Sequence, residues 1–391
     1  MDSIYELSIE RIKKYHIKKI NNIGPLFLVS TAYKGVWLEH VYDSIMYAKL
    51  FNDTSVMLNT INAFIDLQLE NGLYPYSIKE DNTVGYYQIQ ECVSFGKMCM
   101  MAYEMVNDNK LLLKMYESLK KWVSFMYKYR MTLGLNLVEM FVGYDTGHDN
   151  SGRLDGMKYK QNYTHLGKKM YADILPDCDT APIVAVDMNC NLFGNLKALA
   201  KMANILGLEG ESIKYNNMAY ELKDNIFKYL YDENDCYFYD LDKNKNKRKY
   251  KSSTIFHLFL EGVLDKTLDK KLIDQIYNRY INNPNEFMSP YPFPAMSISD
   301  KSIYSHKMNN SWGYYSQALI ALRCSLWMDD YGYSSLYDEV LKKWCIGFVN
   351  NFNISPMSQE LDPITGAASG ASVWYSTSML LFIYAKNRLG I

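Results

Sequence analysis

Apolar side chains recur along this chain at the three- and four-residue spacing of α-helices. The pattern is clearest in residues 55–70, 110–129, 191–207, 217–231, 314–328 and 335–352. Strict alternation of apolar and polar residues, which is typical of half-buried strands, is scarce. Loops with Gly, Pro, Asn and Asp separate the helical segments, as in 70–77, 173–182, 282–296 and 355–372. The pattern predicts about ten to twelve helices.

No Pro-rich, Ser-rich or low-complexity linker interrupts this order, so we expect residues 1–391 to form a single domain. Helix and loop alternate without the sharp period of a solenoid. Helical hairpins closed into a ring, an α/α toroid, would place alternate loops at one mouth. An open helical superhelix is the alternative.

Composition and charge narrow the range of functions. Hydrophobic residues make up 48% and charged residues 22%, which allows a substantial core. Lys and Arg number 42 against 43 Asp and Glu, so no net field would attract nucleic acid or an anionic membrane. The first residues carry acids and lysines, and no later stretch is apolar for the roughly 18 residues of a membrane span. We expect a soluble, cytoplasmic protein with no nucleic-acid or membrane partner; the oligomeric state stays open.

Cysteine and histidine spacing argues against bound metals. The seven cysteines form no C-x-x-C pair, and the six histidines form no H-x-x-x-H pair. No glycine-rich phosphate loop and no G-x-S-x-G motif is present. The sequence therefore predicts no metal and no cofactor. Aromatic residues reach 15%, which suits stacking on sugars, although core packing explains the excess equally well.

Residues 144–153, "YDTGHDNSGR", concentrate polar and charged side chains between Gly147 and Gly152. Glycine and short polar residues disfavour helix, so this stretch is predicted to be a loop. It contains Asp149, and a second loop far along the chain contains Glu360. Cleavage of a glycosidic bond needs two opposed carboxyl groups. Most loop carboxylates are caps or turn residues, so the pair alone does not establish catalysis.

The segment "YDTGHDNSGRLD" resembles the "ESGxDNSPR" signature of α/α-barrel glycoside hydrolases of family 63 and their bacterial relatives, the mannosylglycerate and glucosylglycerate hydrolases. Family 37 trehalases carry a more distant version. Further segments resemble the family's motifs in the same order, namely "YKGVWLEH", "VDMNCNLFGNLKALAKMANILG", "YDENDCYFYDLD", "PYPFPAMSISD" and "QELDPITGAASGASVWYSTSML". The resemblance runs from about Gly24 to the C-terminus.

The resemblance implies an all-α fold, an (α/α)6 toroid with short loop or strand insertions. It implies inverting hydrolysis of a small α-glucoside or similar short α-linked saccharide. Matched residue by residue, Asp149 is the general acid and Glu360 the general base. An inverting pair stands roughly 6.5–9.5 Å apart to admit a water. An aromatic-walled pocket would raise the pKa of the acid.

Further positions fall where the family binds the sugar or frames the site: Trp37, His40, Gln90, Asp145, His148, Asn150, Arg153, Trp312, Trp374 and Tyr375. Asp145 is expected to hold sugar hydroxyls, with a loop cap as the alternative. Arg153 is expected to orient Asp145 or another carboxylate, or else to form a structural salt bridge. The aromatic residues serve either as sugar platforms or as core.

Some positions depart from the family pattern. Relatives have "WxWD" where this chain has "WLEH", so Glu39 and His40 replace Trp and Asp, and an expected sugar-binding carboxylate is missing. Gln90 is a weak match, and Trp312 lacks the neighbouring Arg of the relatives. Two alternatives therefore stay open. One is a sugar epimerase, isomerase or lyase using His148 or His306, and the other is a catalytically weak carbohydrate-binding relative.

Overall fold

The structure is a computed structural model that describes residues 1–20, 23–156, 164–165, 168–169, 171–176, 178–300, 302–307 and 312–391. This part of the chain contains twelve α-helices. They are α1 (Asp2–Arg11), α2 (Val41–Phe51), α3 (Ser55–Asp66), α4 (Phe95–Val106), α5 (Asn109–Tyr129), α6 (Val186–Ile205), α7 (Glu209–Leu230), α8 (Phe256–Leu260), α9 (Lys270–Ile276), α10 (Ala318–Arg323), α11 (Ser334–Asn351) and α12 (Ser376–Leu389).

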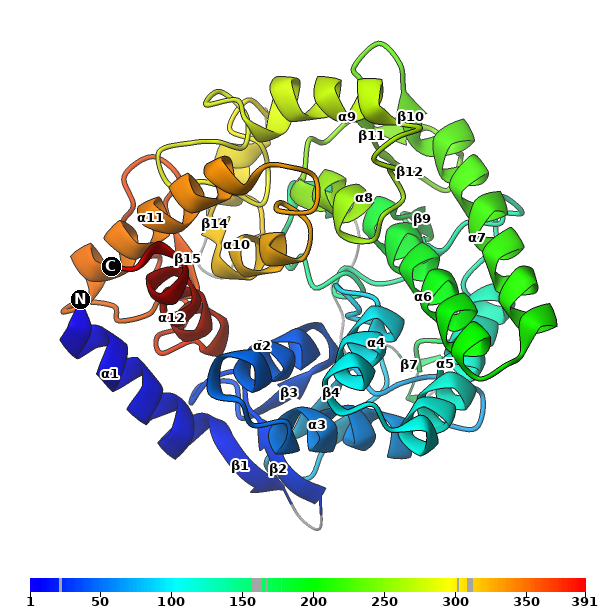
Figure 1. Ribbon diagram of the computed structural model, residues 1–391. Coiled ribbons are helices and arrows are strands. Elements are labelled where there is room, and N and C mark those ends of the chain that lie inside the picture. Colours follow the sequence, from blue (N-terminus) through cyan, green and yellow to red (C-terminus); the bar gives the residue numbers. More distant parts are fainter. Residues whose placement is uncertain are drawn as a thin grey trace.

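The helices form a closed ring, with the even-numbered helices inside and the odd-numbered helices outside (Figure 1). The ring closes where α12 packs against α2 and α1. There the two ends of the chain meet, since Tyr5 donates a hydrogen bond to Asn387 at 3.0 Å and Lys386 pairs with Asp2 at 2.8 Å. The predicted helical toroid is thus confirmed, and the open superhelix is excluded.

Sequence periodicity explains which helices lie inside. The outer helix α7 buries a single stripe, consisting of Tyr215, Ala219, Leu222, Ile226 and Leu230 at helical spacing. The inner helix α6 is buried nearly all round, as its run of Leu, Phe, Ala and Met requires. One hydrophobic cluster extends from Ile4 to Ala385, so the core follows the ring through most of the chain.

An all-α description needs one correction, because the described residues also contain short strands in six antiparallel sheets. The strands are β1 (Ile17–Ile20), β2 (Ile23–Phe27), β3 (Gly35–Trp37), β4 (Ser77–Lys79), β5 (Val84–Gly85), β6 (Glu139–Met140), β7 (Thr164–His165), β8 (Lys168–Lys169), β9 (Ile183–Val184), β10 (Tyr231–Asp232), β11 (Tyr237–Phe238), β12 (Asp240–Leu241), β13 (Lys247–Arg248), β14 (Ser316–Gln317) and β15 (Glu360–Leu361). The largest sheet has the order β13-β12-β9-β6, and β3-β4-β5 form another. Strands this short cannot show a readable alternation of apolar and polar residues.

The strands and loops that precede the inner helices collect the polar segments. β3 leads into α2, β9 into α6 and β14 into α10, whereas β15 lies in the long loop before α12. β14 falls inside a segment predicted to be helical, and it pairs with β15 so that Gln317 lies opposite Glu360.

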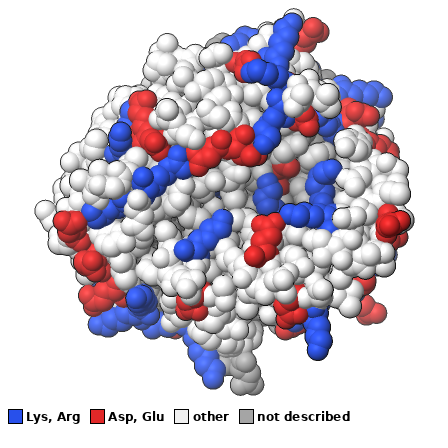
Figure 2. Space-filling model, in the orientation of Figure 1, with Lys and Arg blue, Asp and Glu red and all other residues white. Residues whose placement is uncertain are grey.

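Surface charge is mixed over the face shown in Figure 2, where Lys and Arg alternate with Asp and Glu. This agrees with the nearly equal counts of acidic and basic residues. Within the described residues, no helix has both the length and the apolar character needed to cross a membrane.

Candidate active site

A cavity of about 240 Å³ lies among the loops that precede α2, α4, α6, α10 and α12. Its aromatic wall consists of Tyr33, Trp37, Tyr76, Tyr144, Trp312 and Tyr375. Its polar wall consists of Glu39, His40, Lys79, Gln88, Gln90, Asp149, Asn150 and Gln359. A neighbouring cavity of about 500 Å³ shares Tyr33, Trp37 and Lys79 with it. Aromatic faces combined with a few converging polar groups suit a small polar ligand.

Asp149 lines this cavity from the predicted loop. Gly147 and Asn150, on either side, have left-handed backbone with φ of 72° and 59°, which shapes the turn. Burial, and then the charge of Glu39, raise the pKa of Asp149 well above its usual value. Its Oδ1 atom has no hydrogen-bond partner among the described residues. Burial therefore favours the protonated form of Asp149, and its Oδ1 atom is available to a ligand.

Glu360 is fully buried in β15, and its Oε2 accepts a hydrogen bond from Gln317 Nε2 at 2.8 Å. The neighbouring Gln359 lines the cavity, whereas Glu360 lies just outside that lining. Tyr33 links the two predicted catalytic positions. Burial raises the pKa of its hydroxyl, as do the nearby charges of Asp149 and Glu360.

His40 and Tyr375 form a polar pair on the cavity wall. The Nε2 atom of His40 lies 2.5 Å from the Tyr375 hydroxyl, and its Nδ1 atom lies 3.3 Å from Glu39 Oε1. Burial lowers the pKa of His40 well below its usual value, so the imidazole is neutral. Burial raises the pKa of Glu39 to about 7, against a weaker opposing effect of the Arg323 cation.

Gln90, Trp37 and Trp312 also lie on the cavity wall, as the resemblance predicts. The backbone of Gln90 has φ of 51°, and its amide Oε1 has no hydrogen-bond partner among the described residues. Trp37 meets Tyr33 edge to face with ring centroids 5.8 Å apart. Trp312 stacks on His148 at 4.4 Å, which places His148 behind the aromatic wall.

Asp145 and Trp374 lie away from the cavity lining, and these placements correct the expectation that they contact the sugar. The Asp145 carboxylate pairs with Arg130 and accepts hydrogen bonds from the backbone of Ile89 at 3.0 Å and of Phe141 at 2.7 Å. It therefore holds the loop together. The Trp374 ring lies under the Arg11 guanidinium at 3.9 Å.

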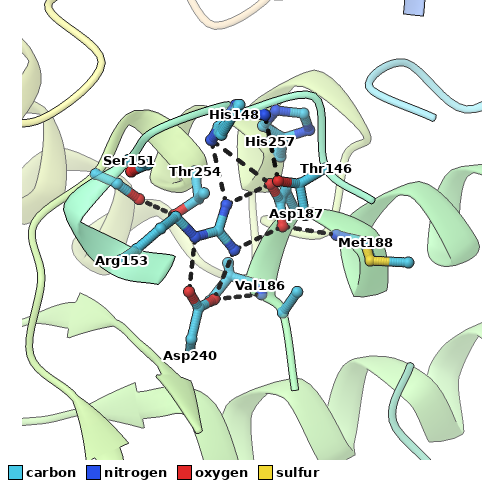
Figure 3. Close-up of polar contacts among 12 residues, drawn as sticks. Thr146, His148, Ser151, Arg153, Val186, Asp187, Met188, Asp240, Thr254 and His257 are labelled. Atoms are coloured by element: carbon cyan, nitrogen blue, oxygen red, sulfur yellow. Dashed lines mark hydrogen bonds and ion pairs between the residues drawn. The ribbon is translucent and has the colours of Figure 1, made fainter. Parts of the chain in front are cut away.

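Arg153 joins the loop to the sheet and to α6 (Figure 3). Its Nε donates to Asp240 Oδ2 at 2.7 Å, and its NH1 donates to Asp187 Oδ2 at 2.6 Å. The same NH1 lies 3.2 Å from His148 Nδ1. The carboxylates that Arg153 binds are thus Asp187 and Asp240, not Asp145. Arg153 lies outside the cavity lining and supports the loop that carries Asp149.

His148, Asp187 and His257 bring potential metal-binding atoms within 4.8 Å of one another. The Arg153 guanidinium already contacts His148 Nδ1 and both carboxylate oxygens of Asp187. A second cation there would meet this charge at close range. The group therefore fits a charge-balanced support for the loop better than a metal centre.

A family model described as the mannosylglycerate hydrolase MGH1-like glycoside hydrolase domain matches residues 45–376. The chain belongs to this family.

Solved structures agree with this MGH1-like assignment at the level of the fold. The chain resembles the GH63 mannosylglycerate hydrolase of Thermus thermophilus in complex with glucose, with a TM-score of 0.74, 14% identity, and coverage of 97% of this chain and 99% of the other. It also resembles the neutral trehalase Nth1 of Saccharomyces cerevisiae, with a TM-score of 0.67, 14% identity, and coverage of 94% and 75%. An uncharacterized protein of Borreliella burgdorferi is 29% identical over 128 residues, 33% of this chain and 26% of its own length. The matched region thus spans about a quarter of that relative.

Several residues on the cavity wall of this MGH1-like chain were not predicted as ligands: Tyr33, Glu39, Tyr76, Lys79, Gln88, Tyr144 and Gln359. Tyr33 and Glu39 lie within "YKGVWLEH", and Gln88 begins the weakly matching "QIQECV" segment. These motifs carried a signal that could have identified them. Lys79 ends a short strand without any motif, and only the pairing of β4 with β3 brings it to the site.

Proposed function

We propose that this glycoside hydrolase cleaves a short α-linked glycoside with inversion, with Asp149 as general acid and Glu360 as general base. The observation that carries the proposal is a buried carboxyl group, Asp149, that lines an aromatic-walled cavity and has an oxygen without a hydrogen-bond partner among the described residues. Asp149 transfers its proton to the glycosidic oxygen while the bond from that oxygen to the anomeric carbon breaks. Glu360 takes a proton from water, whose oxygen attacks the opposite face of the sugar. The first product is the β-anomer.

The environment of each carboxyl group supports its role. A general acid must be protonated near neutral pH, and burial together with the Glu39 charge raises the pKa of Asp149 in that direction. A general base must be held in place, and Glu360 is fixed by the β14–β15 pairing and by the Gln317 amide. We also propose that residues 1–391 act as one domain, because the main cluster of buried residues follows the ring from Ile4 to Ala385.

The outer cavity indicates the kind of leaving group. Lys79 lines both cavities and forms no ion pair or side-chain hydrogen bond with the described residues, and the outer cavity also contains Lys34, Glu80 and Asp81. An anionic leaving group would pair with it. The Thermus thermophilus enzyme has been solved with Tris and D-glycerate. A glycosyl-glycerate is therefore our first candidate substrate, and a neutral α-disaccharide is the second.

Epimerase, isomerase or lyase chemistry has less support. His148 stacks behind Trp312 and receives Arg153 at its Nδ1 atom, so it does not reach the cavity. His306 is outside the residues whose side chains the structure describes. His40 is on the wall, but its neutral ring is engaged by Tyr375.

Product stereochemistry tests the proposal. Proton NMR should follow the first anomer released from mannosyl- and glucosyl-glycerates and from α-disaccharides. Release of the β-anomer is expected, and release of the α-anomer or no turnover across the panel would overturn the proposal.

The two catalytic roles are separated with α-glucosyl fluoride, whose leaving group needs no proton. Asp149→Asn should retain most activity on the fluoride while its kcat on the glycoside falls by about 10²–10⁴-fold. Glu360→Gln should lose both activities. Glu117→Gln, an exposed acid on α5, is the matched control and should behave as wild type. If Asp149→Asn lowered kcat equally on the glycoside and on the fluoride, Asp149 would not be the general acid.

A further inference from the structure

Glu39 brings a carboxyl group to the cavity wall beside Asp149. It lies in a short 3-10 turn, Leu38–His40, directly before α2. Its side chain is only 12% exposed, and that exposure faces the cavity. Glu39 and Asp149 line the same cavity, and the charge of Glu39 contributes to the raised pKa of Asp149.

The loop around Gly147 makes room for this carboxyl group. A Cβ atom on Gly147 would lie 2.4 Å from Glu39 Oε2 and 2.9 Å from Cys92 Sγ. The left-handed backbone of Gly147, with φ of 72°, also favours glycine there. The Cys92 thiol donates weakly to Glu39 Oε2 at 3.6 Å. Glu39 thus occupies a defined position and is not a flexible surface acid.

The protein supplies few donors to the Glu39 carboxylate. Within the described residues it forms no ion pair with Lys or Arg, and the His40 ring, whose Nδ1 atom lies 3.3 Å from Oε1, is neutral. Arg323 binds the backbone oxygen of Glu39 at 3.0 Å, not its carboxylate. A buried carboxylate is costly unless it receives hydrogen bonds, so a ligand with hydroxyl donors would stabilise it.

Other polar atoms on the same wall also have room for a hydrogen bond from a ligand. The amide oxygens Gln88 Oε1 and Gln90 Oε1 and the ring nitrogen His40 Nδ1 have no hydrogen-bond partner among the described residues. All three residues line the cavity together with Glu39. A sugar offers several hydroxyl groups that donate to oxygen acceptors at once.

We propose that Glu39 is a specificity-determining residue whose carboxylate binds hydroxyl groups of the sugar unit that is cleaved, together with Gln88 and Gln90. This inference depends on the proposed function, which places that sugar unit in the cavity next to Asp149. Glu39 acts here as a ligand for the sugar, and Asp149 and Glu360 carry out the proton transfers.

Calorimetry with glucose, mannose and their monodeoxy analogues tests the inference independently of turnover. Wild type, Glu39→Gln and the surface control Glu117→Gln are compared, and circular dichroism checks that each variant is folded. Glu39→Gln should weaken binding of the preferred sugar by about 10- to 100-fold, as loss of a hydrogen bond to a charged group predicts. The analogue that lacks the bound hydroxyl should bind wild type and Glu39→Gln equally.

The outcomes separate the two proposals. Wild-type binding and kcat/KM in a folded Glu39→Gln, with inverting hydrolysis intact, would overturn the role of Glu39 alone. Equal weakening for the parent sugar and for every deoxy analogue would also overturn it. Selective loss of binding in Glu39→Gln, without glycoside hydrolysis by wild type, would support Glu39 and overturn the proposed hydrolysis.

Discussion

Replacing Arg153 with Met should destabilise the fold through the two carboxylates with which the arginine forms ion pairs. Methionine retains much of the apolar stem but removes the cation and its hydrogen bonds. Asp187 and Asp240 are only 3% and 5% exposed, so they would be left buried without a counter-ion. In wild type, Arg153 reaches Asp187 at 2.6 and 2.9 Å and Asp240 at 2.7 and 2.9 Å.

Removing one partner of a buried ion pair costs about 3–5 kcal/mol. Here the single Arg153 cation pairs with two carboxylates. The free-energy costs of leaving each carboxylate unpaired are therefore not additive. We therefore expect the free energy of unfolding to fall by at least about 3–5 kcal/mol at pH 7. Stabilities of natural proteins are about 5–15 kcal/mol, so this loss is a large part of the total.

The destabilisation caused by Arg153→Met should decrease as the pH is lowered. Burial opposes ionisation of Asp187, but Arg153 outweighs it and holds the pKa of Asp187 below its ordinary value. A carboxyl whose pKa is lowered by folding contributes stability above its unfolded pKa, and this is lost as the pH falls through the folded value. In Arg153→Met the unpaired carboxylates take up protons at higher pH. The difference in the free energy of unfolding between wild type and variant should therefore become smaller as the pH is lowered from 7 to 4.5.

Urea unfolding followed by circular dichroism at both pH values measures this difference. Arg279→Met is the matched control, because Arg279 is exposed and makes one long hydrogen bond of 3.5 Å to a backbone oxygen. It should change stability by less than about 0.5 kcal/mol. A loss below about 1 kcal/mol in Arg153→Met at pH 7, or a difference that widens on acidification, would refute the reasoning.

Three further predictions concern the cavity. Gly147→Ala should lower Tm and raise KM, because the added Cβ would lie 2.4 Å from Glu39 Oε2. Thermal unfolding and steady-state kinetics measure the two effects, and wild-type values of both would contradict the prediction. Glu39→Gln should shift the alkaline limb of the pH profile of kcat/KM to lower pH, because the Glu39 charge raises the pKa of Asp149 and a neutral amide does not. An unchanged limb would show that Glu39 does not affect the pKa of Asp149. Lys79→Met should raise KM for a glycosyl-glycerate but not for a neutral α-disaccharide, and equal changes for both substrates would exclude pairing with the leaving group.

Helical periodicity predicted the ring well where a helix buries a long stripe. The segment 110–129 became α5 (Asn109–Tyr129), and 335–352 became α11 (Ser334–Asn351). The strands could not be predicted, because their pairing joins segments far apart in the chain. Ser316 and Gln317 in β14 look helical in their own context, and they are strand because they pair with Leu361 and Glu360.

The candidate site was predicted unevenly for a related reason. The motifs located the loop of Asp149 and the segment of Glu360, but not the direction of each side chain. Within ten residues, Asp145 turns inward to Arg130, Asp149 faces the cavity and Arg153 turns to Asp187. Left-handed residues in the turn decide these directions, and only the folded backbone reveals them.

The departure at "WLEH" is better understood as a relocated carboxyl group than as a lost one. At position 40 the chain has a neutral imidazole bound to Tyr375, whereas Glu39 brings a carboxyl group to the same cavity from one residue earlier. The turn before α2 permits this change without altering the ring, because the core of α2 begins at Val41 and Tyr42. Gly147 leaves the space that the Glu39 carboxyl group fills. The alternative of a carbohydrate-binding protein was based on the missing carboxylate at position 40. Asp149 and Glu39 line the same cavity, and burial raises the pKa of Asp149 as a general acid requires, so our proposal is hydrolysis with altered recognition of the sugar and not binding alone.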